Sequence, residues 1–328
     1  MLEAAPGSAL LQWLSPDIGW VALSVSWVAL AGRLRETPPI FCRHICPVHA
    51  TVPLTQTAAD VDLLVETAAG FTDDLAAEQP FSVQTRFLGE GWSVGPYDVN
   101  TPAAAALARG GAPLDVRNPV QVLSIVATPQ MGYLGLSLAA DNLSDWAGGA
   151  RRFRQEKGQI SRAEFKLLEA LEVFDLDVAG ARTALDLGAA PGGWTRVLRQ
   201  RGVRVVAVDP AALDPRLEDD DGIRHVRQLA EDFLPSAEGI FDIIVNDIRM
   251  DARDSARLMG RAVEHLHPRG WGLITLKLPK RDFVSPLQTA LEMLGRTYEI
   301  IGARQLFHNR SEVTVAVQRK ESIAWPRS

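Results

Sequence analysis

Four ionisable residues, far apart in the chain, combine two amines with two carboxylates. Asp247 and Lys277 each follow an apolar run that is typical of a buried strand. Lys166 precedes the first expected strand of this half, and Glu312 begins the last one, which runs in the opposite direction. Ligands bind at the carboxyl ends of strands in an open α/β sheet, so we expect the four side chains to meet there. Such a set could orient a hydroxyl group and take its proton.

A glycine-rich turn after the strand at 183–187 is a candidate cofactor site. Glycines let the backbone approach a ligand, and Asp209, which ends the next strand, could accept hydrogen bonds from ribose hydroxyls. The spacing is not G-x-G-x-x-G and no lysine follows, which disfavours dinucleotide and P-loop sites and leaves a plain strand–turn–helix as the alternative. The candidate cofactor residues are Asp186, Gly188, Ala189, Ala190, Pro191, Gly192, Gly193, Trp194, Asp209, Asp232 and Asp247.

Strands alternate with helices from residue 161 to residue 320, which predicts an α/β fold with a Rossmann-like sheet of seven strands. The last two strands are expected to form an antiparallel hairpin around 307–312. A helix is expected over 161–174, with Ser161 and Glu164 forming a capping box.

These motifs resemble the FtsJ-type ribose 2′-O-methyltransferases. The glycine turn has their D-x-G-x-x-P-G-G-W form, and the four ionisable residues match their K-D-K-E tetrad in order. The segments 161–167, 276–281 and 303–315 are similar to the THUMP-bearing subfamily that methylates a cytidine ribose in 23S ribosomal RNA. The chain departs from these patterns in Ile248, where the heat-shock branch has proline, and in Ala190, where the close subfamily often has cysteine.

The resemblance implies S-adenosylmethionine as cofactor and an RNA substrate, large-subunit ribosomal RNA or an assembly intermediate. Lys277 would take or polarise the proton of the ribose 2′-hydroxyl, which requires burial beside Lys166 to disfavour its charged form. Asp247 would orient Lys277 near the sulfonium, and Lys166 and Glu312 would position the ribose. Two alternatives stay open: the same reaction on transfer RNA, a cap or another RNA, and a silent methyltransferase fold that binds RNA or assists ribosome assembly.

Charge is distributed unevenly along the 328 residues. Residues 1–150 contain 6 basic and 14 acidic side chains, for a net charge of −8, whereas the rest contains 28 and 26, for +2. This excludes binding of nucleic acid by diffuse positive charge in the first half. The apolar run 18–31 is too short to span a bilayer and lacks a basic leader, so we expect a strand pair or strand–helix element and a cytoplasmic protein without membrane contact.

The first half is predicted to hold two small α/β pieces. Expected strands at 19–30 and 40–45 would form a ferredoxin-like segment over 1–50. Helices at 55–78 and 101–109, with strands at 81–87, 119–128 and 132–139, resemble a THUMP domain over 51–143, an RNA-binding module. The match is carried by 118–122 and 132–136. A packing or dimerisation domain is the alternative, and the oligomeric state is left open.

Two further segments, 42–49 and the hinge at 144–160, carry residue types that can bind a metal ion or RNA. Cys42 and Cys46, with His44 and His49, could suggest a metal site, but an extended chain places the two cysteines about 13 Å apart, too far to share an ion or a disulfide. The hinge at 144–160 combines Trp146 with basic residues and could grip RNA or be a solvated linker. The candidate RNA-binding residues are Arg151, Arg152, Arg154, Lys157, Lys280 and Arg281. The methyltransferase domain is expected over 161–320 and a tail over 321–328.

Overall fold

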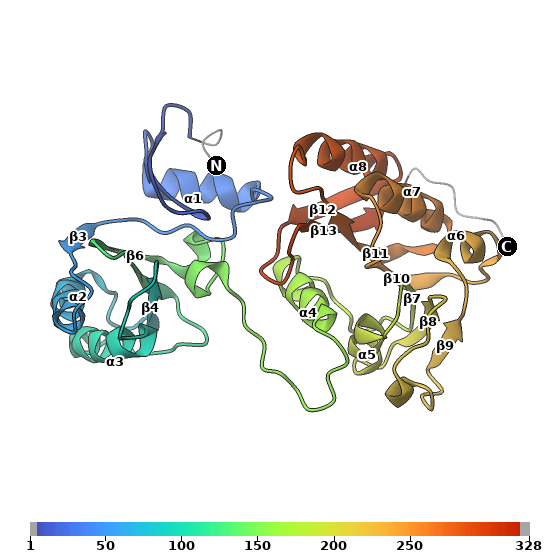
Figure 1. The fold of residues 1–328 in the computed structure, drawn as a ribbon, viewed down its shortest axis with the longest axis horizontal. Helices are drawn as coiled ribbons and strands as arrows, with labels where there is room; N and C mark the ends of the chain where they lie inside the picture. The colour runs from blue at the N-terminus through green and yellow to red at the C-terminus, as the bar shows by residue number, and fades with distance from the viewer. Residues whose placement is uncertain (1–4, 322–328) are drawn as a thin grey trace. The chain divides into compact units, whose positions relative to one another are not determined.

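The computed structural model describes residues 5–321, so the tail expected over 321–328 lies outside the described residues beyond Glu321. The chain divides into two compact units, Met1–Arg151 and Arg152–Ser328, which are described separately (Figure 1). None of the helices in the described part is long and apolar enough to cross a membrane.

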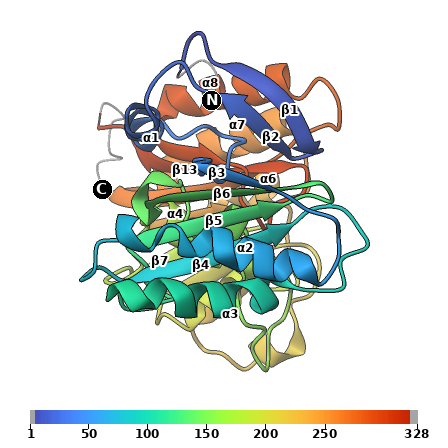
Figure 2. The same ribbon diagram turned by 90° about the vertical axis from the view of Figure 1, so that its left-hand side faces the viewer.

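The first unit is built on a four-stranded sheet in the order β3-β6-β5-β4. Its outer pair β4 and β5 is parallel, and the other neighbours are antiparallel. Helices α2 and α3 lie side by side along one face of this sheet (Figure 2), and Leu64, Val99 and Leu123 are buried between helices and sheet. The bounds are β3 Ala50–Pro53, α2 Ala59–Ala69, β4 Phe81–Phe87, α3 Pro96–Leu107, β5 Gln121–Ala127 and β6 Met131–Leu138.

The strands expected at 81–87, 119–128 and 132–139 are therefore present, but both helices have other bounds than predicted. Helix α2 ends at Ala69, well before residue 78, and Gly70 follows it. Helix α3 begins five residues earlier than expected because Pro96 occupies its first position and Asp98 accepts a hydrogen bond from the Gly95 N–H. The helix then continues through Pro102.

The first forty-nine residues differ most from the prediction. The hairpin of β1 (Ala9–Ser15) and β2 (Ile18–Ala22) is followed by α1 (Trp27–Glu36). The run 18–31 is therefore a strand–helix element, which is one of the two forms expected for it. A strand through residue 30 is wrong, because the Ser26 hydroxyl caps a helix by accepting from the Ala29 N–H. The strand expected at 40–45 is absent as well: prolines 39 and 47 bracket this segment and offer no N–H for a ladder.

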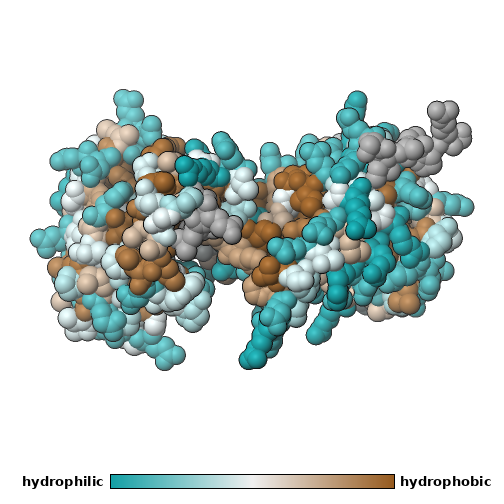
Figure 3. All heavy atoms as spheres, turned by 90° about the horizontal axis from the view of Figure 1, so that it is seen from above, coloured by the Kyte–Doolittle hydropathy of each residue, from teal (hydrophilic) through white to brown (hydrophobic). Residues whose placement is uncertain are grey.

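Apolar side chains stay exposed on the first unit, including Trp13, Tyr97 and Val116. Figure 3 shows such hydrophobic surface among hydrophilic residues. Cys42 and Cys46 are not joined in a disulfide, and burial raises the pKa of the Cys46 thiol to about 11. In the described part of the chain, no three side chains of His, Cys, Asp or Glu are grouped to hold a metal ion.

Gly135 on β6 is a position where only glycine fits. A Cβ added there would lie 1.9 Å from the carbonyl oxygen of Pro47, a backbone atom that cannot move aside without distorting the segment before β3. Gly135→Ala is therefore expected to destabilise the first unit by about 3 kcal/mol and to lower its Tm by roughly 10 °C. Calorimetry of the purified variant measures this.

The matched control is Gly32→Ala in α1, where an added Cβ meets nothing within 4 Å. Removing a helix-interior glycine is expected to leave the Tm unchanged or raise it slightly. Equal Tm values for the two variants would show that the backbone near Pro47 relaxes freely.

The second unit is built on a sheet of seven strands, the number that the sequence predicts, in the order β12-β13-β11-β10-β7-β8-β9. Strands β11, β10, β7, β8 and β9 are parallel to one another, and β13 is antiparallel to both of its neighbours. The bounds are β7 Thr183–Leu187, β8 Arg204–Val208, β9 Ile223–Val226, β10 Phe241–Asn246, β11 Leu266–Lys277, β12 Tyr298–Arg304 and β13 Glu312–Arg319.

Helices cover both faces of this sheet (Figure 1). On one face, α4 and α5 pack on alternate strand residues such as Ala184, Val205 and Val245. On the other, α7 and α8 pack against each other, and α7 packs on β10 and β11. The bounds are α4 Ala163–Val173, α5 Gly193–Arg199, α6 Ala230–Phe233, α7 Ala252–Ala262 and α8 Val284–Thr297. This doubly wound arrangement brings the loops after β7, β8, β10 and β11 to one edge.

Candidate active site

Four charged side chains meet at the carboxyl edge of the second sheet. Asp247 immediately follows β10, and Lys277 is the last residue of the adjacent β11. Glu312 is the first residue of β13 and lies directly opposite Lys277 in the antiparallel register. Lys166 reaches the same point from α4. The structure thus brings together the four residues that the sequence singles out.

The two amines and two carboxylates form a closed network of ion pairs. Lys277 Nζ donates to Asp247 Oδ1 at 2.5 Å and also to Glu312 Oε2. Lys166 Nζ lies 2.7 Å from Glu312 Oε1 and 3.3 Å from both carboxylate oxygens of Asp247. The hydroxyl of Thr275 donates to Asp247 Oδ1 at 2.5 Å. Each ammonium therefore bridges both carboxylates, and the formal charges of the four residues cancel.

Burial makes these charges strongly interdependent, because the four side chains are only 8–22% exposed. Burial by itself would lower the pKa of Lys166, but the neighbouring Asp247 and Glu312 outweigh it and raise that pKa. Burial by itself would raise the pKa of Asp247, but Lys277 and Lys166 outweigh it and lower that pKa. The ionised forms thus stabilise each other.

The glycine turn after β7 lies at the same edge and leaves no room for side chains. Gly188 has φ +76° and Gly192 has φ +107°, in the left-handed region that favours glycine. A Cβ at Gly188 would lie 2.4 Å from Ile248 Cγ1, next to Asp247 in the chain. The turn therefore lies directly against the segment that follows β10.

Asp209 and Asp232 take different positions around this turn. The Asp209 carboxylate accepts hydrogen bonds from the Ala190 N–H at 3.1 Å and from the Ala211 N–H at 2.8 Å, so it ties the glycine turn to the end of β8. Asp232 lies on the short helix α6 after β9 with its side chain exposed. The structure brings Asp209 onto the turn and leaves Asp232 on the surface beyond it.

Asp186, inside β7, is a fully buried acid at this site. It accepts a hydrogen bond from Thr195 Oγ1 at 2.6 Å. Burial is the main cause that raises its pKa to about 7, and the nearby carboxylates of Asp247 and Asp209 act in the same direction. At neutral pH this group therefore titrates in the folded protein.

The raised pKa makes stability depend on pH in a defined direction. Between about pH 4 and pH 7 the folded chain holds a proton on Asp186 that the unfolded chain has lost, so stability falls as pH rises through this window. Asp186→Asn should remove this dependence. Between pH 4 and pH 8, the free energy of unfolding of the variant should rise relative to that of the wild type by up to about 4 kcal/mol. Urea unfolding of both proteins at these pH values measures it, and parallel pH profiles would contradict it.

The start of α4 differs from the predicted capping box. Glu164 accepts from the N–H groups of Ile160 and Ser161, which is half of the box, but the helix begins at Ala163 and the Ser161 hydroxyl does not cap it. A Cβ on Gly193 would lie 2.3 Å from Ser161 Oγ, so this hydroxyl faces α5 instead. Glu164 also pairs with Arg196 of α5 at 2.6 Å, which fixes the two helices to each other.

Glu169 belongs to the site's framework and was not identified from the sequence. Its buried carboxylate accepts hydrogen bonds from the N–H groups of Phe307 and His308, at 2.7 and 3.0 Å. Through Glu169 and Lys166, one turn apart, α4 holds the β12–β13 loop and Glu312 at its end. The only available signal was an acid three residues after Lys166 on an apolar helix.

The predicted RNA-binding residues are spread over several segments. Arg151, in the first unit, lies over the ring of Trp146 at 4.5 Å. Lys280 and Arg281 are exposed on the loop after β11. Arg152, Arg154 and Lys157 are exposed on the segment that leads to α4.

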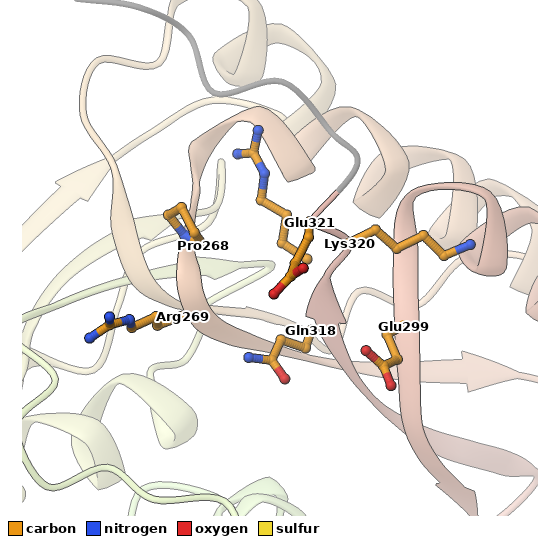
Figure 4. Close-up of a pocket in the computed structure, with 7 residues that line it drawn as sticks. Pro268, Arg269, Glu299, Gln318, Lys320 and Glu321 are labelled. Atoms are coloured by element: carbon orange, nitrogen blue, oxygen red, sulfur yellow. The ribbon is translucent and has the colours of Figure 1, made fainter.

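A surface pocket of about 460 Å³ lies at the other end of the sheet (Figure 4). It is lined by residues such as Arg269, Glu299 and Gln318, and the labelled side chains of both charges surround it. Gln318 is at the end of β13 opposite to Glu312. This pocket is therefore separate from the candidate active site.

A seven-stranded sheet with an antiparallel β13, a glycine turn after β7 and an acid after β8 defines a Rossmann-like methyltransferase fold. Residues 159–266 match the family of FtsJ-like methyltransferases. The match confirms the resemblance to the FtsJ-type methyltransferases that is seen in the sequence.

Curated relatives match a longer part of the chain than this segment. Three proteins named "Ribosomal RNA large subunit methyltransferase M" are similar to the chain. The one from Halorhodospira halophila is 38% identical over 181 residues, 54% of this chain and 52% of that protein. Those from Pseudomonas syringae pv. syringae and Shewanella sp. W3-18-1 are 31% and 28% identical, over 66% and 68% of this chain and 63% and 65% of theirs. The chain thus matches between about half and two thirds of the length of these relatives.

Proposed function

We propose that the protein is an S-adenosylmethionine-dependent RNA ribose 2′-O-methyltransferase that acts on a cytidine of large-subunit ribosomal RNA. The observation that carries the proposal is the network of Lys166, Asp247, Lys277 and Glu312 beside the glycine turn of one sheet. The relatives' printed name supports the large-subunit substrate.

The cofactor is proposed to bind at the glycine turn. Gly188 and Gly192 give this turn its left-handed backbone, and the Asp209 carboxylate, anchored by two main-chain N–H groups, is fixed where it can accept ribose hydroxyls. Asp186, Asp232 and Asp247 complete the acids at this edge. S-adenosylmethionine supplies an activated methyl group when it is bound.

The residues of the network are proposed to polarise the ribose 2′-hydroxyl and to hold the groups that accept its proton. Lys277, held between Asp247 and Glu312, is placed to polarise the 2′-hydroxyl and to stabilise negative charge that develops on its oxygen. For Lys277 to take the proton itself, it must first pass one to Asp247 or Glu312, which it already contacts. Lys166, from the opposite side of the network, keeps both carboxylates in place.

RNA is proposed to contact the hinge and the loop after β11 through the six basic residues named above. We further propose that residues 1–50 and 51–143 act as a ferredoxin-like segment and a THUMP-like RNA-binding domain, that 144–160 is the basic hinge, and that the methyltransferase domain covers 161–320. The net charge of −8 over residues 1–150 requires contact through a few placed groups.

The test uses S-adenosylmethionine labelled on the methyl group and two RNA pools that lack native modifications, ribosomal and transfer. We expect label in large-subunit RNA, retained when the bases are removed and located on a cytidine ribose. Label in transfer RNA would keep the chemistry and overturn the substrate. Label lost with the bases would overturn ribose methylation. Cofactor binding without label in any pool, assembly intermediates included, would favour a silent RNA-binding protein.

A further inference from the structure

Three loops at the carboxyl edge of the second sheet carry exposed cations around the candidate active site. Arg249 lies on the loop after β10, Lys280 and Arg281 on the loop after β11, and Arg310 on the loop before β13. These loops belong to the same strands that supply Asp247, Lys277 and Glu312. We call these four cations the rim.

The rim cations differ from nearby arginines in having no acidic partner. Among residues 5–321, none of the four forms an ion pair, whereas Arg253 pairs with Asp251 and Arg257 with Asp254 on α7. Asp282 lies next to Arg281 in the chain but is not paired with it, and Asp251 is already engaged by Arg253. Cations without acidic partners leave a positive potential that an anionic ligand can neutralise.

The charges inside the site do not reduce this potential. The two lysines and two carboxylates of the network cancel, so the network adds no net charge over the ends of β10, β11 and β13, where the rim lies. The rim positions lie at one end of three adjacent strands: Arg249, Lys280 and Arg281 after β10 and β11, and Arg310 before β13. The three strands together span about 10 Å at the usual spacing between strands. This span suits a chain of phosphates passing over the network, and arginine can bind each phosphate with two hydrogen bonds.

We propose that the rim is a phosphate-binding site that holds the RNA backbone on both sides of the nucleotide to be methylated, with Arg249 and Arg310 as its outer contacts. The proposal rests on the proposed function and adds two residues, on separate loops, to the expected RNA contacts. Since the rim binds backbone and not bases, it sets affinity and position, and sequence must be read elsewhere.

The test compares two double variants with equal loss of charge. Arg249→Gln/Arg310→Gln removes the outer rim. The control, Arg204→Gln/Arg269→Gln, removes two exposed arginines near the amino ends of β8 and β11, at the opposite edge of the same sheet. Binding of a fluorescent single-stranded RNA is measured by anisotropy at several salt concentrations, and binding of S-adenosylmethionine by calorimetry.

We expect the rim variant to weaken RNA binding about tenfold near 0.1 M salt and to lower the slope of log Kd against log salt by about 1.4, the value for two phosphate contacts on a single strand. Cofactor binding should be unchanged in both variants. In methylation assays the KM for RNA should rise while kcat at saturating RNA stays the same.

Equal RNA affinities and salt slopes for the rim variant and its control would overturn the proposal that the rim binds phosphate, even if the protein methylates RNA. A fall in kcat without a change in KM would also overturn it, because the arginines would then act in the chemical step. If no RNA is methylated but the rim variant alone loses RNA affinity, the proposed phosphate-binding site is supported and the proposed reaction is overturned. The binding assay thus separates the failure of one proposal from the failure of the other.

Discussion

Lys277→Met is expected to lower kcat for RNA methylation by about 10³-fold and to leave S-adenosylmethionine binding intact. The ammonium of Lys277 is the only group that donates to both Asp247 and Glu312 from β11, and methionine is an unbranched side chain, one atom shorter than lysine, that lacks the charge. Losing proton transfer and charge stabilisation at the reacting oxygen typically costs 10²–10⁴-fold. Single-turnover methylation with saturating RNA measures the effect.

Lys320→Met is the matched control. Lys320 follows β13 at the end opposite to Glu312 and donates to the carbonyl of Gly295, so the same change of side chain there should leave kcat within about twofold. If Lys277→Met retained most of the turnover, Lys277 would have no role in the proton transfer. A loss in cofactor affinity would instead place Lys277 in cofactor binding.

Asp247→Asn is expected to destabilise the second unit by about 3–5 kcal/mol as well as to inactivate it. Two buried ammonium groups would then share a single carboxylate, and removal of one partner from a buried ion pair leaves uncompensated charge. The lowered pKa of Asp247 means that its contribution is present above the ordinary carboxyl pKa and is lost as pH falls below it. Urea unfolding should therefore show the full difference at pH 7 and a decreasing one as the pH falls below the ordinary carboxyl pKa.

A second variant separates charge balance from chemistry. Lys166→Met/Asp247→Asn restores a neutral cluster with one ammonium and one carboxylate, so most of the lost stability should return while turnover stays low. Stability that does not return would mean that Asp247 acts through its hydrogen bond with Thr275 and not through charge. Recovered turnover would remove Asp247 from the mechanism.

The second half of the chain was predictable because its signals are local and repeated. Strands β7, β8 and β10 contain apolar runs followed by glycine or an acid, and β11 contains an apolar run that ends in Lys277, so Asp209, Asp247 and Lys277 could be placed at strand ends from the sequence. Parallel connections then require these ends to share one edge. Glu312 followed from the reversed last strand, and the register confirms its place opposite Lys277.

The parts that were missed depend on contacts between distant segments. Glu169 resembles any helix acid until the 307–308 loop folds onto it, and the Ser161 hydroxyl is turned aside by α5, thirty residues away. In the first half, the apolar run that ends in Trp27-Val-Ala-Leu30 is compatible with a strand as well as a helix. The cap formed by the Ser26 hydroxyl is what identifies the segment as the start of a helix. A short apolar run without periodicity does not distinguish a strand from a helix.

The position of β13 in the sheet sets an order in time for a newly made chain. Glu312 enters the site on β13, which follows β11 and β12 in the chain and inserts between them. A nascent chain that has already formed the glycine turn and the ends of β10 and β11 still lacks the second carboxylate and leaves β11 as an open edge. The network is therefore completed only after the seventh strand of this sheet has been synthesised, and the chain passes through a stage in which the glycine turn exists without a balanced set of charges beside it.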